Sequence, residues 1–453
     1  MTNRRNAIKI MAILGSFIGF KSIGFSGESC CKPLCVQYLE QITELFKKIK
    51  TNQTGNMLEA SSAIARTIKN GGTCYSQWET GHSFDGDLFP DRPGDTNIFK
   101  VGYTLANPPN EPKKGDLLLL NVIRKPIDDP RAKGIFVIGG PNPWCADTEK
   151  TDLLTDDNRK LKIKMYSDIW IETYVTTYGA LLWIPGASFP FGPTTAALNI
   201  ITYWAMTADA VRLLARDGIP VQVRGDEPKL SGEIKYADIN NPLAPLYLDE
   251  CIRQTEMIQG ELGTIGKIAK EAADCILSGG KLYVYSRYRE ALCTEASGKR
   301  GGLVLLKTTF ADDKDFAGTN KDYVIMGIYQ PDDPVDIQML EKFKKAGIKT
   351  ASIGPTTRNG VVPNGRTVPK ESGIHLGYMC DTYGLFAIPG AEKKVSPTSG
   401  LLVNLMFWVT IVRLAEEIMA RTGNVPEIMS TGAMKGGAEK RNRSLEIVKV
   451  RGY

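Results

Sequence analysis

The chain of 453 residues contains only two histidines, His82 and His375. Any chemistry that needs histidine as an acid, a base or a metal ligand therefore has two candidates. The nine cysteines include no Cys-x-x-Cys pair with a partner histidine cluster, so a zinc site is not expected. Cys74 and Cys275 lie in or beside apolar runs and are expected to be small core residues. We predict no metal site and no cofactor.

A cluster of basic residues is also missing. The formal net charge of +6 is spread over the chain, and neither half has a Lys/Arg stripe with interleaved aromatic residues. We therefore expect no binding of nucleic acid. Hydrophobic residues make up 42% and charged residues 23%, the proportions of a globular protein, and the length suits two or three domains.

The N-terminus lacks an apolar run long enough for a comfortable membrane span. Arg4 and Arg5 precede a moderately apolar run, residues 10–20, which Lys21 interrupts. Adjacent arginines before such a run resemble a signal for the twin-arginine export machinery. We expect residues 1–30 to be this signal and the protein to be periplasmic or extracellular. A membrane anchor and a basic start to a cytosolic chain are the alternatives.

One stretch of the sequence occurs twice. Ile-Pro-Gly-Ala at 184–187 leads to Pro-Thr-Thr at 193–195, and the same four residues at 388–391 lead to Pro-Thr-Ser at 397–399. An apolar run precedes each copy and a long amphipathic segment follows it, which predicts strand, loop and helix. Small hydroxyls at such a turn can cap a helix and leave first-turn N–H groups for an oxygen-rich ligand.

Other features recur at nearly the same spacing, between 204 and 209 residues. Asn70-Gly71-Gly72 matches Ser278-Gly279-Gly280, and Tyr38-Leu39-Glu40 matches Tyr247-Leu248-Asp249. We interpret the chain as one module duplicated, with module 1 at 36–216 and module 2 at 246–424. The Gly- and Pro-rich stretch 217–245 is then a linker, and 425–453 a loosely held C-terminal tail.

Within each module, helical apolar spacing alternates with short strands that are apolar on both faces. Helical spacing covers 37–70 and 248–276, and strands are expected at 73–76, 117–122 and 323–328, among others. Strands without a polar face belong to sheets covered on both sides. The predicted fold class is α/β, with two modules that each form a parallel sheet flanked by helices, a flavodoxin-like three-layer sandwich.

The order of these elements resembles the SIS (sugar isomerase) family, in its phosphoheptose-isomerase-like, phosphosugar-binding branch. Residues 79–83 read Glu-Thr-Gly-His-Ser, similar to the loop that follows the first strand of that branch. Glu295, Arg300 and the run Gly301-Gly302-Leu303 match a later part of the pattern. Pro-Thr-Thr and Pro-Thr-Ser match the start of its last helix. Together the motifs cover both halves of the chain.

The resemblance implies a small-molecule sugar or sugar derivative, bound between two modules. It implies acid and base roles for Glu79, His82, Glu295 and His375, with His375 on a loop over the crevice. The implied ligand-binding residues are Ser76, Gly81, Ser83, Thr194, Thr195, Ser286, Arg300, Thr398 and Ser399.

The sequence departs from the family where a phosphate cradle of hydroxyls and glycines should follow the second strand. Both copies have Asp-Asp-Pro instead, at 128–130 and 332–334. Proline lacks the N–H donor and carboxylates repel an anion, so an ordinary phosphosugar site is not expected. The paired aspartates are candidates for sugar hydroxyls or a hard cation, although Asp-Asp-Pro is also an ordinary turn.

Three functions stay open: a sugar isomerase, a carbohydrate-binding or sensing protein without catalysis, and an amino-sugar deaminase or lyase. Trp144, Trp170 and Trp183 are candidates to stack on a sugar ring, although Trp183, in an apolar run, is rather expected in the core. A homo-oligomer is compatible with all three functions.

Overall fold

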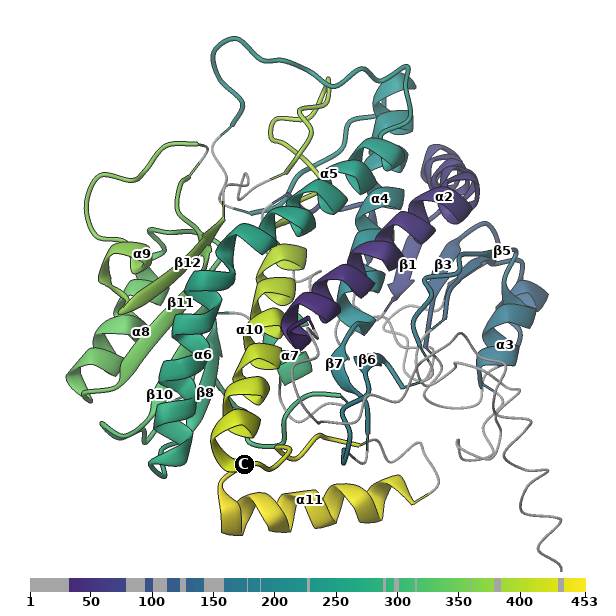
Figure 1. Ribbon diagram of the computed structural model, residues 1–453. Coiled ribbons are helices and arrows are strands. Elements are labelled where there is room, and N and C mark those ends of the chain that lie inside the picture. Colours follow the sequence, from purple (N-terminus) through teal and green to yellow (C-terminus); the bar gives the residue numbers. More distant parts are fainter. Residues whose placement is uncertain are drawn as a thin grey trace, which may run out of the picture. The chain divides into compact units, whose positions relative to one another are not determined.

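The computed structural model describes residues 32–78, 94–100, 112–122, 128–141, 159–176, 178–187, 189–225, 229–287, 291–296, 301–313, 316–358, 360–378, 384–430 and 436–453. Its elements form two five-stranded parallel sheets and the helices that cover them (Figure 1). The predicted α/β fold class is therefore confirmed. We call residues 33–225 the first half and residues 244–430 the second half.

The first sheet has the strand order β2-β1-β3-β4-β5. Its strands are β1 (Cys74–Gln77), β2 (Phe99–Lys100), β3 (Leu117–Leu120), β4 (Phe136–Gly139) and β5 (Ile169–Trp170). All four leucines of β3 are buried, and successive ones enter different apolar clusters on opposite faces of the sheet. The run of four leucines therefore forms a central strand covered on both sides.

The helices of the first half begin with α2 (Leu34–Lys69), a single helix of 36 residues. The short η1 (Pro130–Lys133) and α3 (Arg159–Tyr166) follow β3 and β4 respectively. A small antiparallel pair, β6 (Ala180–Leu182) and β7 (Phe191–Pro193), leads into α4 (Thr195–Arg216). Nineteen of the 22 residues of α4 are buried, so it lies inside the protein and not on its surface.

The second sheet has the order β9-β8-β10-β11-β12, which is the order of the first sheet with each strand replaced by its counterpart. Its strands are β8 (Leu282–Ser286), β9 (Lys307–Phe310), β10 (Tyr323–Gly327), β11 (Lys349–Pro355) and β12 (Ile374–Tyr378). Residues of β10 also alternate between two apolar clusters, one on each face of this sheet.

Two helices, α5 (Ala244–Met257) and α6 (Leu262–Leu277), open the second half, separated by the short η4 (Ile258–Glu261). They are followed by α7 (Ala291–Ala296), α8 (Pro334–Lys345), α9 (Val368–Glu371) and α10 (Ser399–Thr422). Figure 1 shows α8 and α9 on one face of the second sheet and α6 and α10 on the other.

Both halves fix their central strands with the same side-chain contact. Asp116, just before β3, accepts a hydrogen bond from the backbone N–H of Thr73 at 2.8 Å. Asp322, just before β10, accepts one from the N–H of Lys281 at 2.7 Å. In each half this bond holds the start of the first strand beside the start of its neighbour.

The two halves contact each other through reciprocal backbone bonds. The N–H of Gly192 in the first half donates to the carbonyl of Gly301 in the second at 3.0 Å. The N–H of Ser396 in the second half donates to the carbonyl of Gly94 in the first at 3.1 Å. Gly192 and Ser396 lie 204 residues apart in the sequence, so the two halves meet through equivalent surfaces.

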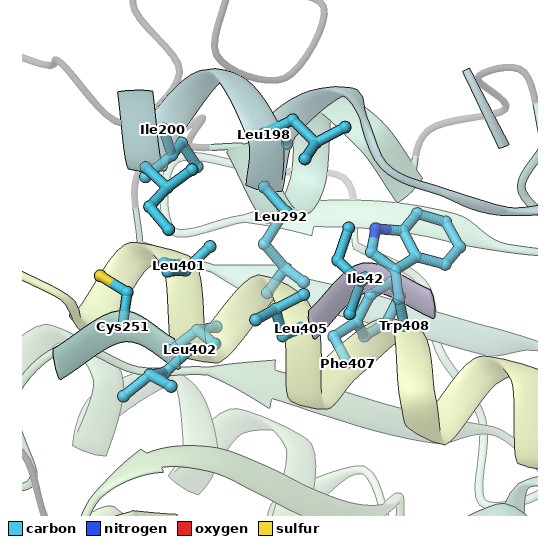
Figure 2. Close-up of a cluster of buried hydrophobic side chains, with 14 of the residues drawn as sticks. Ile42, Leu198, Ile200, Cys251, Leu292, Leu401, Leu402, Leu405, Phe407 and Trp408 are labelled. Carbon is cyan, nitrogen blue, oxygen red and sulfur yellow. The ribbon is translucent and has the colours of Figure 1, made fainter. Parts of the chain in front are cut away.

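One apolar cluster runs through both halves (Figure 2). Helices α2, α4, α5 and α10 pack against one another, and Ile42, Leu198, Cys251 and Leu405 come from these four helices. The burial of all four side chains is complete. The two predicted modules therefore share a core, and residues 33–453 form one unit.

The structure corrects several details of the prediction. Residues 385–388 form no strand of the second sheet and only a single bridge between Phe386 and Val395. The tail expected to be loosely held contains α11 (Gly437–Arg451), which Ser444 ties to Glu427 at 2.7 Å. The linker follows the second half closely, since the N–H of Ala237 donates to the carbonyl of Ala387 at 2.8 Å.

Trp183 is a further correction. The apolar run that contains it predicts a core position, but 60% of its surface is exposed, and its ring meets the edge of Tyr178. None of the described helices has both the length and the apolar content that crossing a membrane requires.

We expect Tyr38→Phe and Tyr247→Phe each to lower the free energy of unfolding by about 1–2 kcal/mol. The hydroxyl of Tyr38 donates to the carbonyl of Pro193 at 2.5 Å, and that of Tyr247 to the carbonyl of Pro397 at 2.9 Å. Each phenylalanine would leave a buried carbonyl without its donor. Urea unfolding measures the effect, with the exposed Tyr236→Phe as control; equal stabilities for all three variants would contradict it.

Candidate functional site

The candidate site lies at the carboxyl ends of the parallel strands. Trp78, just after β1, donates to the carbonyl of Asn199 on α4 at 3.2 Å. Tyr378, the last residue of β12, donates to the carbonyl of Ser399 on α10 at 3.4 Å. Parallel sheets bind ligands at this edge because strand ends, loops and helix N-termini converge there. Of the predicted site residues, Ser76, Thr194, Thr195, Ser286, Glu295, His375, Thr398 and Ser399 belong to the described part. Glu79, Gly81, His82, Ser83 and Arg300 lie outside the described residues.

Glu295 is fully buried on the short helix α7 and is bound by groups from both halves. Its Oε1 accepts a hydrogen bond from the backbone N–H of Ala196, in the first turn of α4, at 3.1 Å. Its Oε2 accepts from Nδ2 of Asn404 at 3.1 Å and from Nε1 of Trp408 at 2.7 Å, both on α10. A charge without water is stabilised by such charge-assisted bonds and by the N-terminus of a helix.

These hydrogen bonds give Glu295 a structural role. These donors point their hydrogens at the carboxylate, and hydrogen bonds to a charged acceptor are stronger than those to a neutral one, so protonation of Glu295 would weaken them. The negative charge also acts on its surroundings: burial, helped by the charge of Glu295, raises the pKa of Tyr38 well above its usual value. Sequence reasoning identified Glu295 but missed Asn404 and Trp408. Trp204 and Trp408, 204 residues apart, are the signal that it overlooked.

His375 lies on strand β12 and not on a loop, so the expected loop over a crevice is wrong for this residue. Its Nδ1 is 2.8 Å from the hydroxyl of Ser352 on β11, and its Nε2 is 3.4 Å from the hydroxyl of Thr356. Burial lowers the pKa of His375 to about 4, partly opposed by the hydrogen bond to Ser352. The imidazole is therefore neutral at pH 7 and already bonded at both nitrogens.

Two predicted ligand-binding hydroxyls stand out. Ser286 ends β8 and Thr195 begins α4, and both residues are fully buried. Neither hydroxyl has a hydrogen-bond partner among the described residues. A buried hydroxyl without a partner costs about 1–3 kcal/mol, so such groups are uncommon away from ligand sites or buried water.

The other predicted hydroxyls belong to Ser76 on β1 and to residues at the starts of α4 and α10. The Ser76 hydroxyl accepts from the N–H of Trp78 at 3.3 Å, and Thr194 is 3.5 Å from the carbonyl of Gly179. Thr194 and Thr398 stand at the N-caps of α4 and α10, but neither side chain caps its helix. Ser399, also buried, is the first residue of α10.

Among the described residues, no three His, Cys, Asp or Glu side chains lie close enough together to hold a metal ion. Asp129 and Asp333 instead accept hydrogen bonds from backbone N–H groups at the starts of η1 and α8. Burial raises the pKa of the Cys74 thiol to about 12 and that of Cys275 to about 11, so neither is a reactive thiolate.

No protein-family model and no curated protein matches the chain. Similar solved structures include a protein from Clostridium difficile 630 described as a "putative phosphosugar isomerase", with a TM-score of 0.49 and 10% identity over 88% of this chain and 96% of that one. Another is the C-terminal domain of glucosamine-fructose-6-phosphate aminotransferase from Francisella tularensis, with a TM-score of 0.45 and 10% identity over 89% and 100% of the two chains. Likenesses of this size assign neither a family nor an activity.

We expect Glu295→Gln to destabilise the protein by about 2–4 kcal/mol, because the amide carries hydrogens that face the hydrogens of the present donors. The measurement is chemical unfolding, followed by tryptophan fluorescence. Glu446→Gln is the control, since 70% of the Glu446 side chain is exposed and an exposed ion pair contributes little. Equal stability of the two variants would show that the buried carboxylate does not hold the halves together.

His375 gives a prediction for the pH dependence of stability. Between pH 6.5 and about 4 the unfolded chain binds a proton at this histidine that the folded chain does not, so the contribution of His375 to stability falls as the pH is lowered through this window. In His375→Asn this component is absent. Denaturant unfolding at neutral and acidic pH should show a smaller loss for the variant than for the wild type; equal losses would refute the prediction.

Proposed function

We propose that the chain binds a sugar derivative at the carboxyl edges of two SIS-type modules that arose by duplication. The observation that carries the proposal is that two buried hydroxyls, Ser286 at the end of β8 and Thr195 at the start of α4, have no hydrogen-bond partner among the described residues. A sugar offers several hydroxyls that both donate and accept, so it would satisfy such groups where an apolar ligand would not. The resemblance of the sequence motifs supports the same class of ligand.

The described geometry favours binding over isomerisation. Moving a proton between C1 and C2 of a sugar requires a base whose lone pair is free to reach the substrate. Glu295 accepts three hydrogen bonds, and both nitrogens of His375 are bonded to hydroxyls. An isomerase would have to depend on Glu79 and His82, which lie outside the described residues; the function proposed here is binding, with isomerisation as its alternative.

Duplication is supported by equivalent contacts at equivalent positions. The segment 222–224, after α4, pairs with 95–97 through backbone bonds, and the segment 427–429, after α10, pairs with 302–304 in the same way. In this proposal module 1 spans 36–216 and module 2 spans 246–424. We also propose export by the twin-arginine route, on the basis of Arg4 and Arg5, and the export machinery is then a transient partner.

The test is a thermal-shift screen of the purified protein against glucose, glucosamine, N-acetylglucosamine and their 6-phosphates. A ligand at about 100 times its Kd adds roughly 2.7 kcal/mol of stability. We expect at least one sugar to stabilise the wild type and Ser286→Ala and Thr195→Val to weaken its binding about tenfold, the loss expected for one hydrogen bond. Ser62→Ala, at an exposed serine of α2, is the control.

Absence of any shift, or a shift that both site variants retain in full, would reject sugar binding at this edge. NMR of the bound sugar during the same experiment distinguishes the catalytic alternative. Conversion of an aldose to a ketose, lost in His82→Ala, would replace the binding proposal by an isomerase.

A further inference from the structure

The N-terminus of α8 lies at the carboxyl edge of the second sheet, after β10. Helix N-termini in this position commonly bind anions, because their free N–H groups and the helix dipole both favour negative charge. Here the first helical residue, Pro334, has no N–H. The N–H groups of Val335 and Asp336 donate to Oδ1 of Asp333, at 2.8 Å and 3.3 Å.

An arginine completes the enclosure of this carboxylate. Arg287 follows Ser286 at the end of β8, and its Nη1 forms an ion pair with Oδ2 of Asp333. The side chain of Asp333 is only 6% exposed and that of Arg287 33%. A helix N-terminus on one oxygen and a guanidinium on the other is the way proteins hold a ligand's phosphate or carboxylate.

The groups next to Asp333 are a second ion pair and a buried carboxyl. Asp332 forms an ion pair with Arg358 at 3.3 Å, and Asp336 is fully enclosed and accepts from the hydroxyl of Tyr285 at 2.9 Å. Burial, and secondly the charge of Asp333, raise the pKa of Asp336 to about 8, so this buried carboxyl is mostly protonated at neutral pH beside the charged Asp333.

We propose that Asp333 is a specificity-determining residue whose carboxylate takes the place of a ligand's phosphate, so that the second half accepts a sugar derivative without a phosphate group. The inference depends on the proposed function only for the class of ligand, a sugar derivative. The exclusion of phosphate by Asp333 is tested independently of it.

The first half supplies a matched control. Asp129 occupies the equivalent place, but its partner is Arg131, two residues along the chain, at 2.7 Å. The helix η1 that it precedes has only four residues, and 31% of the Asp129 side chain is exposed. Among the described residues, removing this carboxylate leaves neither a long helix N-terminus nor an arginine from a strand end.

The experiment titrates inorganic phosphate into the full chain by calorimetry. We expect no saturable binding to the wild type or to Asp129→Ser, and binding at least tenfold tighter than the wild type for Asp333→Ser. Adding Arg287→Ala to Asp333→Ser should remove the gain. Asp333→Asn keeps an oxygen at the helix cap and loses the charge, so it tests the proposal if Asp333→Ser does not fold.

Saturable phosphate binding by the wild type that Arg287→Ala abolishes would overturn the proposal, and so would variants that fold but gain nothing. Sugar titrations of the wild type separate this result from the proposed function. A 6-phosphate that binds more tightly than its parent sugar overturns the exclusion of phosphate and leaves sugar binding in place. If no sugar binds and Asp333→Ser still gains phosphate, sugar binding fails and the role of Asp333 stands.

Discussion

The hydrogen bonds to the buried carboxylate of Glu295 join the two halves at their centre. One donor, the N–H of Ala196, belongs to the first half, and two donors, Asn404 and Trp408, belong to the second. An uncompensated buried charge costs several kcal/mol, so the carboxylate is tolerable only when donors from both halves are present together. Neither half can then separate from the other without exposing Glu295 to an incomplete set of partners.

This dependence explains why two sheets of equal topology share one apolar cluster. Ala196 stands in the first turn of α4, so the bond from Glu295 fixes the position of α4 against α7 and α10. The reciprocal backbone bonds at Gly192 and Ser396 extend the same contact on either side. The hydrogen bonds across this interface hold the Glu295 carboxylate in one position, which is the reason that we give it a structural role.

The fold was predictable from the sequence because both of its signals are local. Apolar runs such as 117–120 define central strands, and the spacing of 204 residues between Pro193 and Pro397 reveals matching turns. The site was less predictable, since its contacts join distant residues. Glu295 and Trp408 are 113 residues apart, and the recurrence of tryptophan at 204 and 408 marks Trp408 without indicating its partner. His375 was misplaced because flanking glycines favour a loop, whereas pairing with β11 overrides that preference.

The two halves differ at the turn before the last helix of each. Gly192 and Ser396 share a left-handed backbone, with φ of 82° and 61°. In the first half only glycine fits, since an added Cβ would lie 2.8 Å from the ring of Tyr38. In the second half a serine accepts the strain of this conformation, about 1–3 kcal/mol, and its buried hydroxyl has no partner among the described residues. Strained backbone conformations of this kind are most often found at functional sites. The two halves therefore differ in the backbone strain at this turn, although the turn leads into equivalent helices in both.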